Sequence, residues 1–298
     1  MIEFPPQFNV QSHVTLARYT NIGIGGPADY LSVVTDQSVF VELYRFCRER
    51  DIRFLAIGDG TNVFFPEAGF RGLIAVIKFD RVSTVAKHAV VAEAGATLDQ
   101  IRYCCVDEGL SGFEFASGIP GTIGGAIYGN AGAYGNNVGE ILTRAKILTA
   151  DGRLLFVDRD FFKFAYRHSR LKENPALVLQ AEFQFVKDDP EKIKARCDEI
   201  IAIRTRKLPP SDIKTAGSWF KNIKDEMGNA TAAAKYLDAV GSKETRVGDA
   251  AVHIKHANIF YNRGHATSSD MLKLEEILRQ RVQERFGICL EREVMFLK

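Results

Sequence analysis

The sequence predicts an α+β protein built from more than one domain, and three observations support this prediction. Runs that are typical of strands alternate with amphipathic, helix-like runs between residues 30 and 206. Pro209-Pro210 then breaks the chain and marks a domain boundary. After this break, helices and short strands follow in an order that suits a small α+β domain with its helices on one face of a sheet. The length of 298 residues allows two or three domains.

The first elements follow from local patterns. An apolar run at residues 30–34 predicts a strand, and Asp36 can cap the helix that follows it. One face of this helix carries Val39, Phe40, Leu43, Phe46 and Cys47. A second strand at residues 53–57 runs into the glycine turn 58–62. Small polar turns that follow strands often hold ligands, so this turn is a candidate binding segment.

The next elements are predicted in the same way. We expect strands at residues 73–77, 89–94 and 176–186. Thr97 and Gln100 form a capping box for a short helix that ends near Gly109. Asp151-Gly152 stands between two apolar runs and predicts a hairpin.

Helices and short strands are predicted after residue 189. Pro190 opens an amphipathic helix that reaches about Arg206. A long helix capped by Thr267 or Ser268 runs to about Phe286. The other elements expected here are a helix near residues 229–239, strands around 249–254 and 258–261, and a last strand after Gly287.

Composition and charge exclude several classes of function. With 39 basic and 37 acidic residues the net charge is +2, which gives no reason to expect nucleic acid or a membrane surface as a partner. We find no N-terminal signal segment and no window of transmembrane length. The five cysteines are scattered and form no CxxC motif, which is typical of thiols in a reducing compartment. We therefore expect a cytoplasmic protein.

Residues 109–139 form a glycine-rich stretch. Ten of the 25 glycines fall within these 31 residues, although glycine loses more backbone freedom on folding than any other residue. Pro120-Gly121 marks a tight turn. Two explanations stay open at this point. The backbone N–H groups can form a nest for a phosphate or pyrophosphate, or the run can be a set of tight turns that pack backbone on backbone.

Three other motifs do not predict a binding site. The run 23–28 imitates a dinucleotide fingerprint, but Pro27 and the strand after it reverse the required order of strand and helix. The run 118–125 lacks the Gly-Lys-Ser/Thr ending of a P-loop. His253 and His256 have no HExxH context and no cysteine partner, so we predict no metal site.

Eight short segments share their order and spacing with one protein family. They are IGIGGPAD (22–29), IGDGTN (57–62), GIPGTIGGA (118–126), NAGAYG (130–135), YRHS (166–169), GSWFKN (217–222), HAN (256–258) and LEREV (290–294). Together they make residues 15–298 similar to the UDP-N-acetylenolpyruvoylglucosamine reductases of bacterial cell-wall synthesis. The interval 167–217 has little room for the tyrosine-bearing loop of some members, so the chain resembles the short subgroup that lacks this loop.

The resemblance implies an FAD-binding module of the vanillyl-alcohol-oxidase/PCMH type. Its two subdomains would be residues 1–70 and 71–207, and residues 208–298 would form an α+β substrate-binding domain. The stretch 109–139 contains no histidine, so we expect FAD to bind noncovalently. Asp59 departs from the family, which more usually has glycine there, and its side chain should point to solvent or to a backbone N–H. The implied FAD-binding residues are Gly58, Asp59, Gly60, Thr61, Asn62, Ser117, Gly118, Ile119, Pro120, Gly121, Thr122, Gly124, Gly125, Asn130, Ala131, Gly132 and Tyr134.

The resemblance also implies a reaction, the reduction of the enolpyruvyl ether of UDP-N-acetylglucosamine to UDP-N-acetylmuramate. NADPH reduces FAD, hydride passes to the vinyl carbon, and negative charge develops on the substrate carboxylate. Arg167 matches the arginine that grips this carboxylate. Glu293 matches the glutamate that stabilises the enediolate, with Glu291 as the alternative. Ser218 matches the proton donor.

Further residues and partners follow from the same resemblance. Lys207, Lys221 and Asn222 are expected to bind phosphates of the substrate or of NADPH. The partners would be a nucleotide sugar and NADPH, without nucleic acid or membrane. The sequence leaves the oligomeric state open, and we expect a monomer.

Two other functions remain open. One is an alcohol or sugar-lactone oxidase of the same FAD fold. The other is a non-catalytic protein that binds flavin or a nucleotide sugar. The joint presence of Arg167, Ser218 and Glu293 disfavours the non-catalytic protein, because a protein that only binds needs no proton donor.

Overall fold

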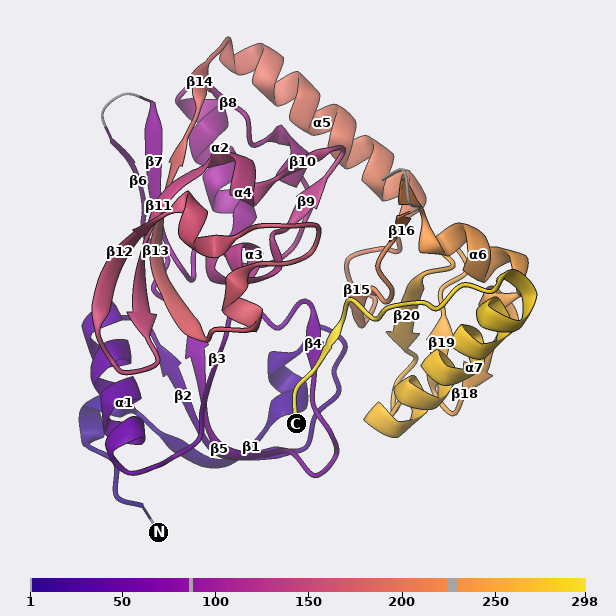
Figure 1. The fold of residues 1–298 in the computed structure, drawn as a ribbon, viewed down its shortest axis with the longest axis horizontal. Helices are drawn as coiled ribbons and strands as arrows, with labels where there is room; N and C mark the ends of the chain where they lie inside the picture. The colour runs from indigo at the N-terminus through magenta and orange to yellow at the C-terminus, as the bar shows by residue number, and fades with distance from the viewer. Residues whose placement is uncertain (1, 86–87, 225–229) are drawn as a thin grey trace. The chain divides into compact units, whose positions relative to one another are not determined.

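The computed structural model describes residues 2–85, 88–224 and 230–298, which form two compact units. Unit 1 comprises Met1–Ser12, Tyr30–Asp59 and Gly72–Arg204. Unit 2 comprises His13–Asp29, Gly60–Arg71 and Thr205–Lys298. Each unit has its own cluster of buried hydrophobic side chains, and Figure 1 traces their elements along the chain.

A four-stranded sheet has the strand order β1-β2-β5-β3. Its strands are β1 (Gln11–Thr15), β2 (Pro27–Val34), β5 (Phe70–Ile77) and β3 (Phe54–Ile57). β3 pairs in parallel with β5, and Phe54 lies opposite Leu73. β2 begins at Pro27, so the element that comes after the glycines of residues 23–26 is a strand and not a helix. The rejection of a dinucleotide fingerprint is therefore confirmed.

Helix α1 (Gln37–Glu49) follows β2, as predicted. The Asp36 carboxylate caps it by accepting hydrogen bonds from Ser38 N at 2.7 Å and Val39 N at 3.1 Å. The predicted apolar face of α1 packs into the core of unit 1, where Phe40, Leu43 and Cys47 are fully buried.

A five-stranded antiparallel sheet is the centre of unit 1, with the order β12-β11-β13-β7-β6. Its strands are β12 (Leu154–Asp158), β11 (Leu142–Thr149), β13 (Ala176–Gln184), β7 (Ala89–Glu93) and β6 (Val82–Val85). β11 and β12 form the hairpin predicted from Asp151-Gly152. The strand expected at residues 176–186 is shorter, because β14 (Val186–Lys187) pairs instead with β8 (Leu110–Ser111).

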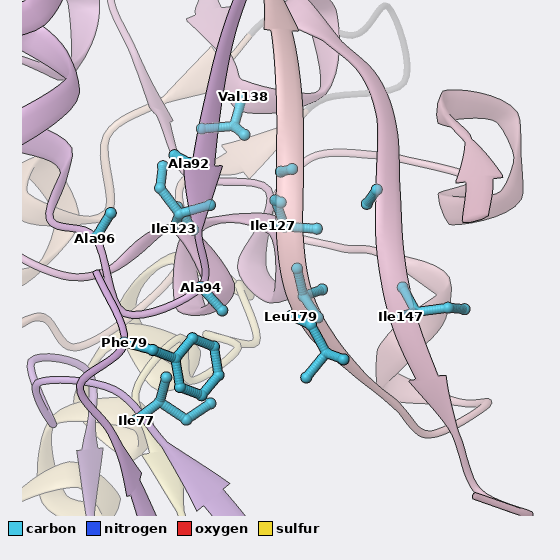
Figure 2. Close-up of a cluster of buried hydrophobic side chains, with 14 of the residues drawn as sticks. Ile77, Phe79, Ala92, Ala94, Ala96, Ile123, Ile127, Val138, Ile147 and Leu179 are labelled. Carbon is cyan, nitrogen blue, oxygen red and sulfur yellow. The ribbon is translucent and has the colours of Figure 1, made fainter. Parts of the chain in front are cut away.

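Helix α3 (Ile123–Gly129) lies inside the glycine-rich stretch, where we predicted no helix. Ile123 and Ile127 lie one helical turn apart, and both are fully buried. α3 packs on β7 and β13, and Figure 2 shows both isoleucines in the same cluster as Ala94 and Leu179. Burial of this pair outweighs the low helix propensity of the glycines around it.

Helices α2 and α5 match the predictions. α2 (Leu98–Asp107) has the predicted capping box, in which Gln100 N donates to Thr97 Oγ1 at 3.1 Å. α5 spans Pro190–Lys207. The short elements, with η for a 3-10 helix, are η1 (Pro6–Phe8), η3 (Glu114–Ala116), β9 (Gly132–Ala133), β10 (Asn136–Asn137), α4 (Val138–Ile141), η4 (Arg159–Phe162) and η5 (Arg170–Lys172).

Unit 2 contains a sheet with the order β15-β20-β19-β18. Its strands are β15 (Thr215–Ser218), β20 (Ile259–Asn262), β19 (Ala250–Val252) and β18 (Arg246–Val247). Helix α7 (Ser268–Phe286) packs on β18 and β19, and helix α6 (Ala233–Ala239) packs on α7. Thr267 caps α7 in a capping box with Asp270, which confirms the predicted start of this helix.

Two predictions for unit 2 need correction. The helix expected near residues 229–239 begins only at Ala233, because β17 (Ala230–Thr231) pairs with β16 (Ile223–Lys224); residue 229 lies outside the described residues. The strand expected after Gly287 is limited to β21 (Met295–Phe296). β21 pairs in parallel with β4 (Val63–Phe64). The 3-10 helices of the unit are η2 (Leu16–Tyr19) and η6 (Ser242–Glu244).

Among the described residues, no helix combines the length and the apolar character that crossing a membrane requires.

Candidate active site

The two segments expected to hold FAD phosphates meet within unit 1. Gly58 directly follows β3, and Thr122 directly precedes α3. A Cβ atom on Gly58 would overlap Thr122 Oγ1 and would lie 3.1 Å from Thr122 Cγ2. The two turns are thus in direct contact, although they are distant in the sequence.

Glycine is found at the positions of the stretch 109–139 for different structural reasons. Gly118 and Gly121 have φ angles of +71° and +130°, which side chains rarely adopt. Gly124 packs against Ala94, because a Cβ atom added at Gly124 would lie only 3.2 Å from the Ala94 side chain. Gly125 is exposed, and the nearest atom to an added Cβ would be Thr122 Oγ1 at 3.7 Å. The main chain here is exposed at Gly125 and packed against the protein at Gly124. Such a backbone fits a flavin nucleotide whose phosphates approach the main chain.

Asp59 does not have the partner that we expected. Its carboxylate accepts a hydrogen bond from Lys78 Nζ at 2.7 Å, so it points neither to bulk solvent alone nor to a backbone N–H. This corrects the prediction. Lys78 comes directly after β5, beside the β3 strand that leads into the turn, and its charge offsets the carboxylate next to the proposed phosphate site.

The rest of the turn 58–62 belongs to unit 2. Gly60 has a φ angle of +65°, and a Cβ there would overlap the Tyr19 carbonyl oxygen. The Gly60 carbonyl accepts a hydrogen bond from Asn21 N at 3.0 Å. Thr61 is half-buried, and Asn62 is exposed while its carbonyl accepts from Met295 N at 3.0 Å. Packing alone therefore accounts for glycine at position 60.

Arg204 is a residue of this region that sequence reasoning missed. Its Nε donates to the Gly118 carbonyl at 3.1 Å. Burial lowers the pKa of the guanidinium, and the nearby Tyr134 acts in the opposite direction. A basic residue on α5 gives no sequence signal by itself, because arginine on an amphipathic helix is usually exposed. Ser117 is buried nearby, with Ile119 and Pro120 in the same turn partly or largely exposed.

Arg167 lies on a turn that is tied to the end of α3. Asn130 Nδ2 donates to the Ala165 carbonyl at 2.9 Å, and Ser169 Oγ donates to the Tyr128 carbonyl at 2.7 Å. Arg167 itself has a φ angle of +52°, an uncommon conformation for a residue other than glycine. Such backbone strain persists only where neighbouring contacts impose it, and it is concentrated at functional sites.

Other residues of the stretch have mainly protein contacts. Besides Ala165, the Asn130 side chain contacts Gly139 N, which donates to Asn130 Oδ1 at 3.0 Å. Ala131 and Gly132 are half-buried, and Gly132 pairs with Asn137. Tyr134 is 51% exposed with a φ angle of +54°, so its ring is available to a ligand.

Ser218 lies at the end of β15 in unit 2, opposite Ile259. Gly217 before it has a φ angle of +82°, so the chain turns in a conformation that favours glycine. The residues after Ser218 are fixed by Asn258, which accepts from Phe220 N at 2.9 Å and donates to the Phe220 carbonyl at 2.8 Å. The Ser218 backbone is therefore held firmly on both sides.

Glu293 lies on the segment beside Ser218. Its backbone N donates to the Trp219 carbonyl at 2.8 Å, and Lys221 N donates to the Glu291 carbonyl at 2.8 Å. Glu293 is half-buried. The Glu291 side chain is 71% exposed and pairs with Lys221 Nζ. The structure thus brings the segments of Ser218 and Glu293 together, and burial distinguishes Glu293 from Glu291.

The other predicted residues of unit 2 are more exposed. Lys207 is exposed at the end of α5. Asn222 is exposed too, and its Oδ1 accepts from Ala233 N at 3.3 Å. His253 and His256 each accept a backbone N–H through Nδ1. Within the described ranges, no group of three or more His, Cys, Asp or Glu side chains could hold a metal ion.

Comparisons with known proteins identify the family of this chain. The family described as "FAD binding domain" matches residues 28–158, and the family described as "UDP-N-acetylenolpyruvoylglucosamine reductase, C-terminal domain" matches residues 209–297. The reductase of Syntrophus aciditrophicus is 37% identical over 284 residues, which cover 94% of this chain and 89% of the relative. That of Pediococcus pentosaceus is 37% identical over 293 residues, which cover 98% and 95%.

A solved structure leads to the same family. The crystal structure of the UDP-N-acetylenolpyruvylglucosamine reductase from Thermus caldophilus has a TM-score of 0.79 and 28% sequence identity, over 96% of this chain and 98% of that chain. The predicted fold class, an FAD-binding module of the PCMH type with a C-terminal α+β domain, is confirmed. The chain belongs to the UDP-N-acetylenolpyruvoylglucosamine reductase family, the FAD-dependent oxidoreductases of peptidoglycan precursor synthesis.

Proposed function

We propose that this protein reduces UDP-N-acetyl-3-O-(1-carboxyvinyl)-glucosamine to UDP-N-acetylmuramate, with noncovalent FAD as cofactor and NADPH as electron donor, in the cytoplasm. The observation that carries the proposal is the main-chain hydrogen bond from Glu293 N to Trp219 O, at 2.8 Å. It holds the main chain of the proposed acid beside the residue that follows the proposed proton donor, and this closeness supports a shared role in protonation.

FAD would be held by the two turns in contact at Gly58 and Thr122, with the glycine-rich stretch against its phosphates. Gly118, Gly121 and Gly125 allow the main chain to come close to the ligand. The Asn130 side chain, which bonds to the Ala165 carbonyl and to Gly139 N, would support the same stretch. When bound, FAD supplies the hydride transfer.

The side chains of this chain would do the remaining chemistry. Arg167 would grip the substrate carboxylate with its planar guanidinium, and the interaction strengthens as charge develops there. Glu293 would donate a hydrogen bond to the enediolate. Ser218 would then deliver the proton to the neighbouring carbon, which a serine can do only to a strongly basic intermediate.

The phosphates of the nucleotide substrates would meet Lys207, Lys221 and Asn222. Lys221 already pairs with Glu291, whose side chain is largely exposed. A phosphate arriving at Lys221 would therefore compete with a solvent-accessible carboxylate, and such surface pairs are weak. We also propose the division into residues 1–70, 71–207 and 208–298, and a monomer that closes its site without a tyrosine-bearing loop.

Replacement of Ser218 by alanine tests the proposed mechanism. We expect Ser218→Ala to bind FAD and to be reduced by NADPH, while reoxidation of the flavin by the enolpyruvyl substrate slows at least about 100-fold. Ser211→Ala, the same change at an exposed position, should behave as the wild type. Full turnover by Ser218→Ala would remove this residue from the mechanism.

A further inference from the structure

Glu275 is a buried carboxylate on α7, in the core of unit 2. The residue is only 5% exposed. Apart from Ser268 at the first position of the helix, the other buried positions of α7 are apolar, and they are Met271, Leu274, Leu278 and Val282. An ionised group at such a position is costly, and well-packed apolar residues often replace buried ion pairs without loss of stability. Folding of α7 alone does not explain a carboxylate here.

The Glu275 carboxylate contacts three donors, one on its own helix and two from other chain segments. Oε2 accepts from Trp219 Nε1 at 2.9 Å and from Arg292 Nη1 at 3.3 Å. Oε1 accepts from Arg279 Nη2, one turn further along α7. The two guanidinium groups compensate the buried negative charge.

Two of these donors adjoin the proposed catalytic residues. Trp219 follows Ser218 in the chain, and Arg292 precedes Glu293. The Trp219 carbonyl also accepts the Glu293 N–H at 2.8 Å. Glu275 therefore closes a ring of contacts, in which the two segments are joined through two main-chain hydrogen bonds and, on the side chains of Trp219 and Arg292, through its carboxylate.

The hydrogen bond to Glu275 helps to orient the indole of Trp219. The ring is fully buried and stacks on Phe260, with ring centroids 4.7 Å apart and an angle of 11° between the ring planes. The centroid of the Phe64 ring lies 5.4 Å away. Stacking defines the plane of the indole, and the hydrogen bond from Nε1 to Glu275 adds a directional polar contact.

We propose that Glu275 is a positioning residue for the protonation step: it keeps Ser218 and Glu293 in a fixed relation by holding Trp219 and Arg292. The inference rests on the proposed function of Ser218 and Glu293. It requires no contact between Glu275 and the substrate.

Single-turnover kinetics with Glu275→Gln test this inference. The bound flavin is reduced with dithionite and mixed anaerobically with UDP-N-acetylenolpyruvoylglucosamine. We expect flavin reoxidation to slow about 10-fold or more, with a larger solvent deuterium isotope effect, because a displaced donor makes proton delivery rate-limiting. Glu276→Gln makes the same chemical change at the exposed neighbouring position of α7 and should leave both values unchanged.

A second variant keeps the test independent of folding. Trp219→Phe keeps an aromatic ring that can stack on Phe260 but removes the N–H donor and part of the ring volume, so it should slow the same step. Combined with Glu275→Gln its effect should be less than additive, because the two side chains contact each other. Since Trp219 is the one tryptophan of the chain, a shift of tryptophan emission in Glu275→Gln reports a changed environment of this indole.

The outcomes separate the inference from the proposed function. Wild-type reoxidation rates and isotope effects in Glu275→Gln, or in Trp219→Phe if the first variant does not fold, overturn the positioning role while Ser218→Ala stays slow. If the substrate does not reoxidise the wild-type flavin, the proposed function fails and the inference fails with it.

Discussion

At the scale of single residues, Gly58 is fixed by a neighbouring side chain that leaves no space for a Cβ atom. An added Cβ would overlap Thr122 Oγ1 and would lie within 3.2 Å of Thr122 Cβ. Thr122 is buried and β-branched, so its side chain has few alternative rotamers. Glycine is needed at this position for packing, in addition to any contact with a cofactor.

We expect Gly58→Ala to lower the free energy of unfolding by about 1–3 kcal/mol, because overpacking forces the backbone or Thr122 to shift. Urea unfolding of the FAD-free protein measures this, and Thr122→Ala in the same chain should restore part of the loss. Gly129→Ala is the matched control: an added Cβ there meets nothing within 4 Å, so stability should be unchanged or slightly raised. Wild-type stability of Gly58→Ala would contradict the account.

Residue types at the site could be predicted from the sequence, but their partners could not. The motif identified Asp59 and Asn130, yet their contacts are with Lys78 and with Ala165, which lie elsewhere in the chain. No sequence pattern indicated that Arg204 belongs to this region. Such pairings depend on how distant segments pack, and a local pattern contains no information on that.

At the scale of elements, a group of charged residues anchors α5 to the start of the glycine-rich stretch. Arg196 Nη2 donates to Glu114 Oε1 at 2.8 Å and to Asp188 Oδ2 at 2.7 Å. Glu114 also accepts from Gly112 N at 2.7 Å and from Ser111 Oγ at 2.8 Å. Burial by itself would raise the pKa of Glu114, but the hydrogen bonds outweigh it and hold the pKa below its usual value.

This anchor predicts a pH dependence of stability. Because the pKa of Glu114 is lower in the folded than in the unfolded chain, its ionised form stabilises the fold above the usual glutamate pKa, and this contribution is lost as pH falls through the folded pKa. Glu114→Gln should therefore be less stable than the wild type at neutral pH and should lose less stability on acidification below about pH 5. Urea unfolding across this range measures both.

Glu199→Gln serves as the control for this experiment, because Glu199 is exposed on the same helix. It should match the wild type at neutral pH. An acid dependence of Glu114→Gln identical to that of the wild type would show that the carboxylate does not stabilise the anchor.

Helices with a local start signal were predictable, and α3 was not. Asp36, Thr97 and Thr267 each cap a helix through side-chain bonds to backbone N–H groups nearby, so the signal lies within a few residues. Thr122 precedes α3 without a side-chain cap bond. Only the burial of Ile123 and Ile127 favours a helix there, and burial is a property of the folded chain.

At the scale of the whole molecule, unit 2 is assembled from three separate pieces of chain. β4 and β21 illustrate this, since Val63 pairs with Met295 in a parallel ladder. Periodicity predicts neither such pairings nor the cofactor. The FAD module was predicted from the family resemblance and is confirmed by the match to residues 28–158. The division at residues 70 and 207 stays a prediction.

The most direct test of the proposed function is the visible spectrum of the purified protein under anaerobic conditions. We expect a yellow protein whose flavin bands bleach with NADPH and return only when UDP-N-acetylenolpyruvoylglucosamine is added. Bleaching that reverses with oxygen but not with the sugar nucleotide would indicate an oxidase of the same fold. A protein that cannot be reconstituted with FAD would contradict the assignment of the glycine-rich stretch as its cradle.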